Sequence, residues 1–198
     1  MSSQERTTPG VWTPANVVTC VRIVLIPVFM LLALAGDGAV ATGCAFGLYV
    51  LLSLTDKLDG YLARSRGEVT DFGKFLDPIA DKLLVFSALL LLLQDSMVSV
   101  WVVFVILVRE FLVSALRMLA GSQGQVIAAD GLGKAKTAVT MVSLCAFYLA
   151  IFLSSLGVAA SVPVLGVARA LMVAAVVLTV VSGVQYFWNA RHVVFGGR

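Results

Sequence analysis

The sequence predicts an all-α integral membrane protein with six transmembrane helices, and two observations support this. First, 60% of the 198 residues are hydrophobic and only 13% are charged, whereas soluble domains carry about 25% charged residues. Second, the apolar residues gather in six segments, each close to the roughly 17 to 25 residues that a helix needs to cross a bilayer. These segments are residues 15–35, 39–54 with a more polar continuation, 73–93, 98–119, 134–155 and 162–187.

The distribution of basic residues predicts how the helices are oriented. The short breaks at 36–38, 94–96 and 157–161 contain no Lys or Arg, and nearly all basic residues fall at the other ends of the helices. By the positive-inside rule, both termini then face the cytoplasm, in a plasma or inner membrane. The net charge of +3 is too modest to suggest a nucleic-acid partner. The expected organisation is a cytosolic tail at 1–12, a six-helix transmembrane domain at 13–190 and a cytosolic tail at 191–198.

The first apolar segment carries a polar stripe near its cytoplasmic end. Asn16, Thr19 and Arg22 are spaced at i, i+3 and i+6, so they lie on neighbouring positions of one helix face. Polar side chains at such a boundary commonly form hydrogen bonds between helices. Arg22 is harder to explain in this way, and a role beside a polar site is the alternative.

The second and third segments bring acidic residues into an apolar setting. A carboxylate at the centre of an inserted helix costs about 2.5 to 3.5 kcal/mol, so each requires a reason. On the second helix Asp56, Asp59, Gly60 and Ala63 follow i, i+3, i+4 and i+7 spacing. On the third, Gly73, Asp77 and Asp81 follow i, i+4 and i+8 spacing. The polar turn at 65–72 is long enough to fold the two helices side by side, which would bring four carboxylates together.

Converging carboxylates raise each other's pKa and need a positive partner to remain ionised. A purely oxygen donor set selects hard cations, which favours Mg²⁺ or Mn²⁺, and carboxylates from facing helices can hold a metal pair. Zinc or iron would be expected to bring His or Cys. The single His192 lies near the C-terminus, and the three cysteines have no metal-ligand spacing.

The pattern Asp-x2-Asp-Gly-x2-Ala-Arg-x8-Gly-x3-Asp-x3-Asp, which runs from Asp56 to Asp81, resembles the signature of the CDP-alcohol phosphatidyltransferases. The resemblance implies a helical bundle with a polar active-site cavity at the cytoplasmic side, a CDP-diacylglycerol substrate and a homodimer. It also implies that Asp81 is the general base and shares metal coordination with the other three acids. The metal ligands expected on this basis are Asp56, Asp59, Asp77 and Asp81, around two ions.

The small and basic residues of the motif would bind the lipid nucleotide. A minimal side chain allows a nucleotide to approach the helix backbone, and the Arg64 guanidinium matches phosphate oxygens, although Arg64 could also be an interfacial anchor. The resemblance also extends to the Asn-x2-Thr-x2-Arg stripe of the first helix, which in this family borders the active site. The residues expected at CDP-diacylglycerol are Gly60, Ala63, Arg64, Gly73, Asn16 and Thr19. No Ser, Cys or His occupies a motif position, so direct displacement by the acceptor alcohol is favoured over a covalent enzyme intermediate.

The fourth and fifth segments predict the type of acceptor. Glu110 and Arg117 share one helix face with Ser114, and Arg109 lies about 100° from Glu110 around the helix. Lys134 and Lys136 begin the next helix, and a helix start with adjacent lysines favours anions. A pocket that contains Arg109, Arg117, Lys134 and Lys136, with Glu110 among them, predicts an acceptor that carries a phosphate.

This half of the chain is similar to the phosphatidylglycerophosphate synthase subfamily in its Arg-Glu-Phe run at 109–111, in Arg117 and in the Gly-Lys-x-Lys-Thr run at 133–137. The implied acceptor is glycerol 3-phosphate, and the products are phosphatidylglycerol phosphate and CMP. Inositol phosphate is the alternative acceptor. The basic residues could also be ordinary membrane anchors, and Arg109 with Glu110 a structural ion pair. A cation transporter that uses the Asp cluster as its ion path is a remote alternative.

Overall fold

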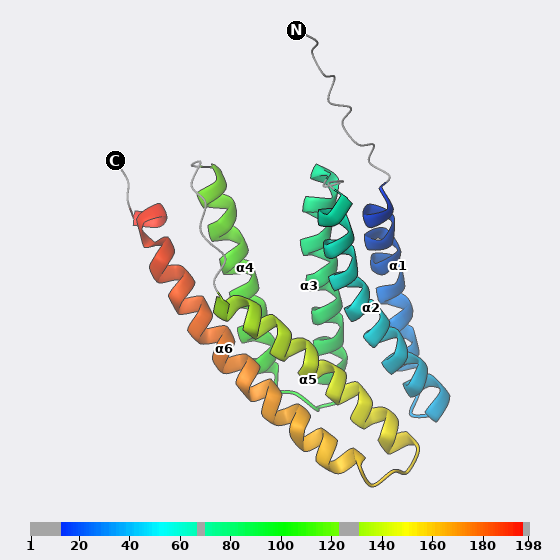
Figure 1. Cartoon of the computed structure of the whole chain (residues 1–198). Helices are drawn as coiled ribbons and strands as arrows, with labels where there is room; N and C mark the ends of the chain where they lie inside the picture. The colour runs from blue at the N-terminus through cyan, green and yellow to red at the C-terminus, as the bar shows by residue number, and fades with distance from the viewer. Residues whose placement is uncertain (1–12, 67–69, 123–130, 196–198) are drawn as a thin grey trace. The chain divides into compact units, whose positions relative to one another are not determined.

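The computed structural model describes residues 13–66, 70–122 and 131–195. Within these ranges the side chains of residues 15, 56–66, 71, 74 and 192–195 are not described. The described elements are six α-helices (Figure 1), which confirms the predicted all-helical fold. They are α1 (Pro14–Leu34), α2 (Ala39–Arg66), α3 (Asp71–Gln94), α4 (Val100–Ser122), α5 (Gly131–Ser155) and α6 (Ser161–Phe195).

Three of the described helices are long and apolar enough to cross a membrane. The corresponding stretches are Asn16–Leu34, Gly131–Ser155 and Ser161–Arg191. The uninterrupted apolar part of α2 is shorter, at Ala39–Thr55, and α4 carries three charged residues within its length. These observations support a membrane protein, and the count of six spans stays a prediction.

Local sequence explains where the first and third helices begin. The Thr13 hydroxyl accepts a hydrogen bond of 3.3 Å from the backbone N–H of Asn16, and Pro14 occupies the first turn of α1. Thr70 caps α3 in the same way, because its Oγ1 accepts a 3.0 Å hydrogen bond from the backbone N–H of Gly73. After α1, Gly36 adopts a φ of +118°, a conformation that is costly for residues with a Cβ.

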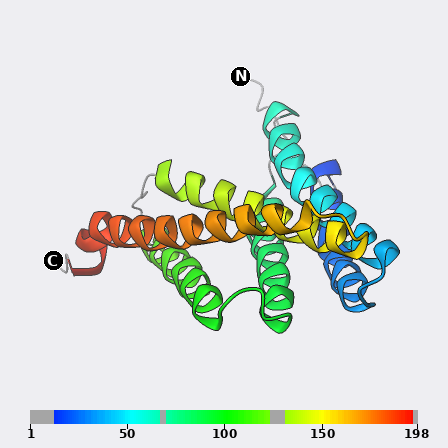
Figure 2. The ribbon, with the colours of Figure 1, turned by 90° about the horizontal axis from the view of Figure 1, so that it is seen from below.

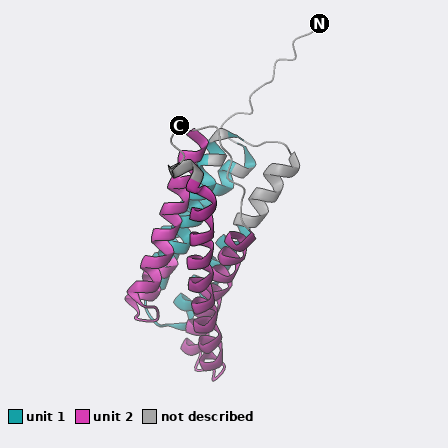
Figure 3. Cartoon of the chain, turned by 90° about the vertical axis from the view of Figure 1, so that its left-hand side faces the viewer, with its two compact units in different colours: residues 1–87 teal, residues 88–198 magenta. Residues whose placement is uncertain are grey.

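The chain divides into two compact units within α3, residues 1–87 and 88–198 (Figure 3). In the first unit α1 packs against α2. The rings of Phe29 and Tyr49, both fully buried, lie 5.5 Å apart between these two helices. This contact fixes α1 beside the helix that carries the first half of the acidic motif.

In the second unit α6 packs against both α5 and α4 (Figure 1 and Figure 2). Two small, fully buried residues meet at the α5–α6 interface, where the Ser143 hydroxyl donates a 2.9 Å hydrogen bond to the carbonyl of Ala168. The Tyr148 hydroxyl donates to the carbonyl of Ala88 at 3.1 Å, which ties α5 to the last part of α3. Small side chains let helix backbones approach closely where the surrounding lipid provides no hydrophobic driving force.

Candidate active site

The first half of the acidic motif lies on α2, whose backbone is helical through Arg66. The predicted i, i+3, i+4 and i+7 spacing therefore applies to a real helix. The side chains themselves are outside the described part of the chain. This holds for the predicted metal ligands and nucleotide-binding residues Asp56, Asp59, Gly60, Ala63 and Arg64.

The second half of the motif begins where α1 meets α3. Asn16 Nδ2 donates a 2.7 Å hydrogen bond to Thr70 Oγ1, the same oxygen that caps α3 by accepting from the backbone N–H of Gly73. A Cβ at Gly73 would lie only 2.5 Å from Asn16 Oδ1. Gly73 is therefore a point of close approach between the two helices, and a larger residue there must displace Asn16.

One turn further along α1, Thr19 contacts Asp77, which is the first acid of the motif whose side chain the structure describes. Thr19 is fully buried, and its hydroxyl donates a 2.8 Å hydrogen bond to Asp77 Oδ1. Arg22 follows on the same face of α1 and is also buried. The predicted polar stripe of α1 thus faces the motif helix through hydrogen bonds between helices. A contact of Asn16 or Thr19 with CDP-diacylglycerol stays a prediction.

The two described members of the predicted metal set have a suitable donor chemistry. Asp77 is exposed and Asp81 is half-buried one turn later on α3, and both offer only the oxygen donors that Mg²⁺ and Mn²⁺ prefer. The hydrogen bond from Thr19 orients the Asp77 carboxylate, as ligand-supporting residues do in metal sites. Among the described side chains no group of three His, Cys, Asp or Glu residues gathers. The full set of four also needs Asp56 and Asp59.

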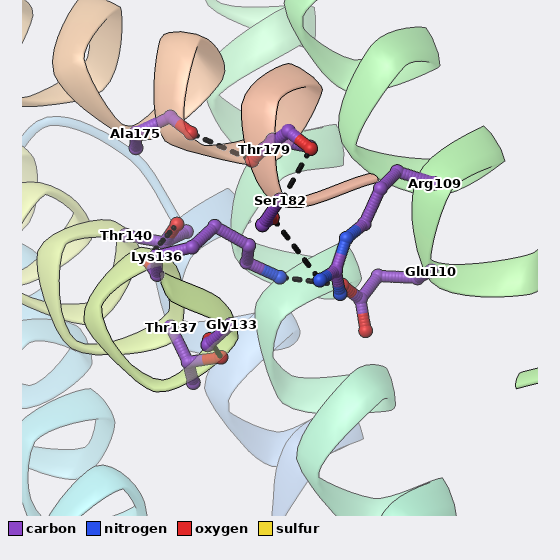
Figure 4. A network of polar contacts seen from close by, with 9 residues as sticks. All are labelled: Arg109, Glu110, Gly133, Lys136, Thr137, Thr140, Ala175, Thr179 and Ser182. Atoms are coloured by element: carbon purple, nitrogen blue, oxygen red, sulfur yellow. Dashed lines mark hydrogen bonds and ion pairs between the residues drawn. The ribbon is translucent and has the colours of Figure 1, made fainter. Parts of the chain in front are cut away.

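A second polar cluster lies in the other unit and joins α4 to α5 (Figure 4). Glu110 Oε1 accepts from Arg109 Nη1 at 2.9 Å and from Lys136 Nζ at 2.5 Å. The side chains are largely withdrawn from solvent, with exposed fractions of 13% for Arg109, 18% for Glu110 and 6% for Lys136. Although Arg109 and Glu110 are adjacent in sequence, their long side chains meet. The cluster holds two cations and one anion.

The helix α6 adds a member that sequence reasoning missed. Ser182 Oγ accepts a 3.1 Å hydrogen bond from Arg109 Nη2 and donates to the carbonyl of Thr179 at 3.2 Å (Figure 4). A serine in an apolar helix usually bonds to its own backbone, and its bond to a residue 73 positions away leaves no local signal. The only indication in the sequence is the Ser182-Gly183 pair within a run of Val, Leu and Ala.

The other two predicted acceptor residues lie elsewhere on the surface of this unit. Arg117 and Lys134 are both exposed. Among the described residues, no hydrogen bond or ion pair joins either of them to Glu110. The structure therefore brings together Arg109, Glu110 and Lys136 and leaves Arg117 and Lys134 outside this hydrogen-bonded group.

The family model for CDP-alcohol phosphatidyltransferases matches residues 12–182, which include the motif and the cluster. The chain belongs to the CDP-alcohol phosphatidyltransferase family. A Bacillus subtilis CDP-diacylglycerol–glycerol-3-phosphate 3-phosphatidyltransferase is 41% identical, over 88% of this chain and 95% of the relative. A probable phosphatidylglycerophosphate synthase of Mycobacterium tuberculosis is 38% identical, over 93% of this chain and 84% of the relative. A Rickettsia felis protein named like the first is 36% identical, over 87% and 92%.

This CDP-alcohol phosphatidyltransferase also contains an apolar cavity of about 390 Å³ between α4 and α6. Phe104, Leu112 and Val184 are among its lining side chains, and Arg109 is the charged residue on its wall. The guanidinium of Arg109 therefore lies between a polar cluster and an apolar space. Its Nε is buried and has no hydrogen-bond partner among the described residues.

Proposed function

We propose that this enzyme transfers the phosphatidyl group of CDP-diacylglycerol to glycerol 3-phosphate and releases phosphatidylglycerol phosphate and CMP. Family membership supports the phosphatidyl transfer, and the names of relatives at 36 to 41% identity over most of their length support this acceptor. The observation in the structure that carries the proposal is the cluster at Glu110. Two cations share one carboxylate there, which leaves one positive charge for a phosphate-bearing acceptor.

Glu110 has a supporting part in this proposal. An ionised carboxylate repels phosphate, so Glu110 would not bind the acceptor directly. It instead holds the Arg109 guanidinium and the Lys136 ammonium in place. Arg109 would then present a planar fork to the phosphate and Lys136 a compact charge. The exposed Arg117 and Lys134 would attract the anion from outside the cluster.

The acids of the motif would hold two Mg²⁺ or Mn²⁺ ions, which when bound would neutralise the pyrophosphate of CDP-diacylglycerol. Asp81 would remove the proton from the acceptor hydroxyl. The hydroxyl oxygen then forms a bond to the phosphorus that carries diacylglycerol, and the bond from this phosphorus to the CMP oxygen breaks. Thr19 would keep Asp77 oriented through the 2.8 Å hydrogen bond. Gly60, Ala63, Arg64 and Gly73 are the proposed contacts for the nucleotide and pyrophosphate.

We further propose that all six helices cross a plasma or inner membrane, with both termini and the motif on the cytoplasmic side. The concentration of basic residues at one end of the helices supports this arrangement. A polar active-site cavity open to the cytoplasm and a homodimer stay predictions from the resemblance. The cation-transporter alternative is not proposed, because the chain belongs to a family of transferases.

The identity of the lipid product tests the proposal. Purified protein in detergent is incubated with CDP-diacylglycerol, glycerol 3-phosphate and Mg²⁺ or Mn²⁺, and the lipids are analysed by mass spectrometry. Phosphatidylglycerol phosphate in the complete reaction, and none after chelation of the metal, is the expected result. A product lipid that forms equally well with chelator would contradict the metal assignment, and an absence of this lipid under all conditions would contradict the acceptor.

A further inference from the structure

The side chain of Arg109 is held by hydrogen bonds to residues of α4 and α6, and α5 passes close to it. Its Nη1 donates to Glu110 on its own helix α4, and its Nη2 donates to Ser182 on α6 at 3.1 Å. From α5, the position of a Cβ at Gly133 would lie 3.5 Å from Nη2. The guanidinium therefore has a defined place relative to the whole of the second unit.

The helix α6 determines both the polar and the apolar surroundings of this side chain. Ser182 is fully buried, and its single proton is used on the Thr179 carbonyl, so its oxygen is oriented as an acceptor toward Arg109. The next residue, Gly183, lies against the aliphatic stem, since a Cβ there would be 3.1 Å from Arg109 Cγ. A Cβ at position 183 would therefore require the stem of Arg109 to shift by a few tenths of an ångström.

An apolar pocket adjoins the side chain of Arg109, which forms part of its wall. This cavity is lined mainly by apolar side chains of α4 and α6, so a guanidinium that turned into it would find few acceptors. If Arg109 were held only by its ion pair with Glu110, its guanidinium could still rotate about the terminal bonds of the Arg109 side chain. The second hydrogen bond, to Ser182, selects one orientation of the planar fork, and the direction of a fork decides whether it can bind a phosphate through two N–H groups.

We propose that Ser182 is a positioning residue that orients the Arg109 guanidinium toward the phosphate of the acceptor alcohol, with Gly183 as the site that gives Arg109 the room to adopt this orientation. This inference rests on the proposed function. It assigns to α6 a part in acceptor recognition, through a residue that itself touches Arg109 and not the substrate.

The experiment compares Ser182→Ala with Ser143→Ala. Ser143 is a matched control because it is also fully buried and hydrogen-bonds to a backbone carbonyl at the α5–α6 interface, outside the cluster. In the full enzyme, KM is measured for glycerol 3-phosphate and separately for CDP-diacylglycerol. Ser182→Ala should raise KM for glycerol 3-phosphate by about tenfold or more, the effect of one hydrogen bond to a charged group, and change KM for CDP-diacylglycerol by less than about twofold.

Two further variants keep the outcome decisive. Gly183→Ala retains the Ser182 hydroxyl but forces the stem of Arg109 to shift by a few tenths of an ångström, so it should raise the same KM by a smaller factor even if Ser182→Ala does not fold. On an Arg109→Met background, where Glu110 keeps its pair with Lys136, Ser182→Ala should add no further rise in KM, because its effect passes through the guanidinium. Three results would overturn the inference. They are an equal rise in KM for both substrates, a rise in KM no larger than that of Ser143→Ala, and a rise from Ser182→Ala that adds fully to that of Arg109→Met.

If the wild-type enzyme uses another phosphorylated acceptor, the comparison is made with that compound. If it uses none, the proposed function fails and the inference falls with it.

Discussion

At the scale of single residues, the balance of charges in the cluster of Arg109, Glu110 and Lys136 links this structure most directly to its proposed substrate. Arg109 and Lys136 are both mostly buried, and both donate to the same carboxylate oxygen. Removal of a partner from such a buried group costs about 3 to 5 kcal/mol, so each member supports the others. With one carboxylate for two cations, the cluster keeps a positive charge. A bound phosphate would complete the pairing.

Lys136 and Lys134 provide a test of this balance because they lie two residues apart at the start of α5. Lys136 is buried and bonded to Glu110, whereas Lys134 is exposed. Lys136→Met should raise KM for glycerol 3-phosphate by about tenfold or more, since a charge that acts away from water is screened less. Lys134→Met should raise it by a smaller factor, and this smaller effect should decrease further at high ionic strength. Steady-state kinetics that show the reverse order would contradict the assignment of the phosphate to the buried cluster.

For Asp81, the proposed chemistry can be tested by separating two roles, that of general base and that of metal ligand. Asp81→Asn keeps the size of the side chain and one potential ligand oxygen but removes the base, so kcat should fall about 10²- to 10⁴-fold. Binding of Mn²⁺, measured by electron paramagnetic resonance, should change much less. Asp95→Asn is the control, because Asp95 is an exposed acid just beyond the end of α3. Equal losses of turnover and of Mn²⁺ binding would show that Asp81 acts as a metal ligand only.

At the scale of elements, the junction of α1 with the start of α3 fixes the second half of the motif. Asn16 bonds to the cap of α3 through Thr70, and Thr19 bonds to Asp77 one turn later. These contacts set both the rotation of α3 and its distance from α1. Pro78 lies between Asp77 and Asp81 inside α3, so one helical N–H is missing beside the acids. The polar side chains of α1 therefore hold α3 in place through hydrogen bonds, although α1 itself carries no residue of the acidic motif.

Gly73→Ala tests this junction. The added Cβ would lie 2.5 Å from Asn16 Oδ1, so α1 and α3 must separate or Asn16 must leave Thr70. We expect the midpoint of thermal unfolding in detergent to fall by about 5 °C, from an overpacking cost of about 1 to 3 kcal/mol. Gly47→Ala on α2 is the matched control, since no atom lies within 4 Å of the corresponding Cβ. It should leave the midpoint unchanged or raise it, because alanine is the better helix former. Equal shifts for the two variants would contradict the close approach at Gly73.

The sequence predicted the elements well because apolar length and spacing are local signals. All six predicted segments are helical, and the helix starts at Pro14 and Asp71 follow from the caps Thr13 and Thr70. An ion pair between Arg109 and Glu110 was one of the alternatives that the sequence left open, and the structure contains it. The contribution of Ser182 could not be predicted, because it depends on how α6 packs against α4 and not on any pattern within α6. For the same reason, four basic residues were expected in one pocket, and the structure joins only two of them.

At the scale of the whole molecule, the proposed reaction needs a lipid substrate and a water-soluble one. Within the part of the chain that the structure describes, three helices are long and apolar enough to cross a membrane. The helices α2, α3 and α4 are more polar because they carry the motif and part of the cationic cluster. Charged residues within membrane helices usually face a polar interior and not the lipid, so each of these helices is expected to turn its charged face away from the lipid. The residues that reduce their hydropathy include Asp77, Asp81 and Arg109, which the proposed chemistry uses.

The proposed orientation can be tested by cysteine labelling in intact cells. Cys20, Cys44 and Cys145 are first replaced, and single cysteines are then introduced at Asp37 or at Lys134. A membrane-impermeant maleimide should label the cysteine at 37 from outside, and should label the cysteine at 134 only after the membrane is opened. The opposite pattern would place the cationic end of the helices outside and would contradict a cytoplasmic supply of the acceptor.

The acceptor itself is the most direct test of the central claim. Purified enzyme with CDP-diacylglycerol and Mg²⁺ or Mn²⁺ is given glycerol 3-phosphate, inositol phosphate, glycerol or serine at equal concentration, and the release of CMP is followed. We predict rapid release with glycerol 3-phosphate and little with glycerol, because only the phosphorylated compound can pair with Arg109 and Lys136. Release that is as fast with glycerol as with glycerol 3-phosphate would contradict the assignment of the buried cluster to the acceptor's phosphate.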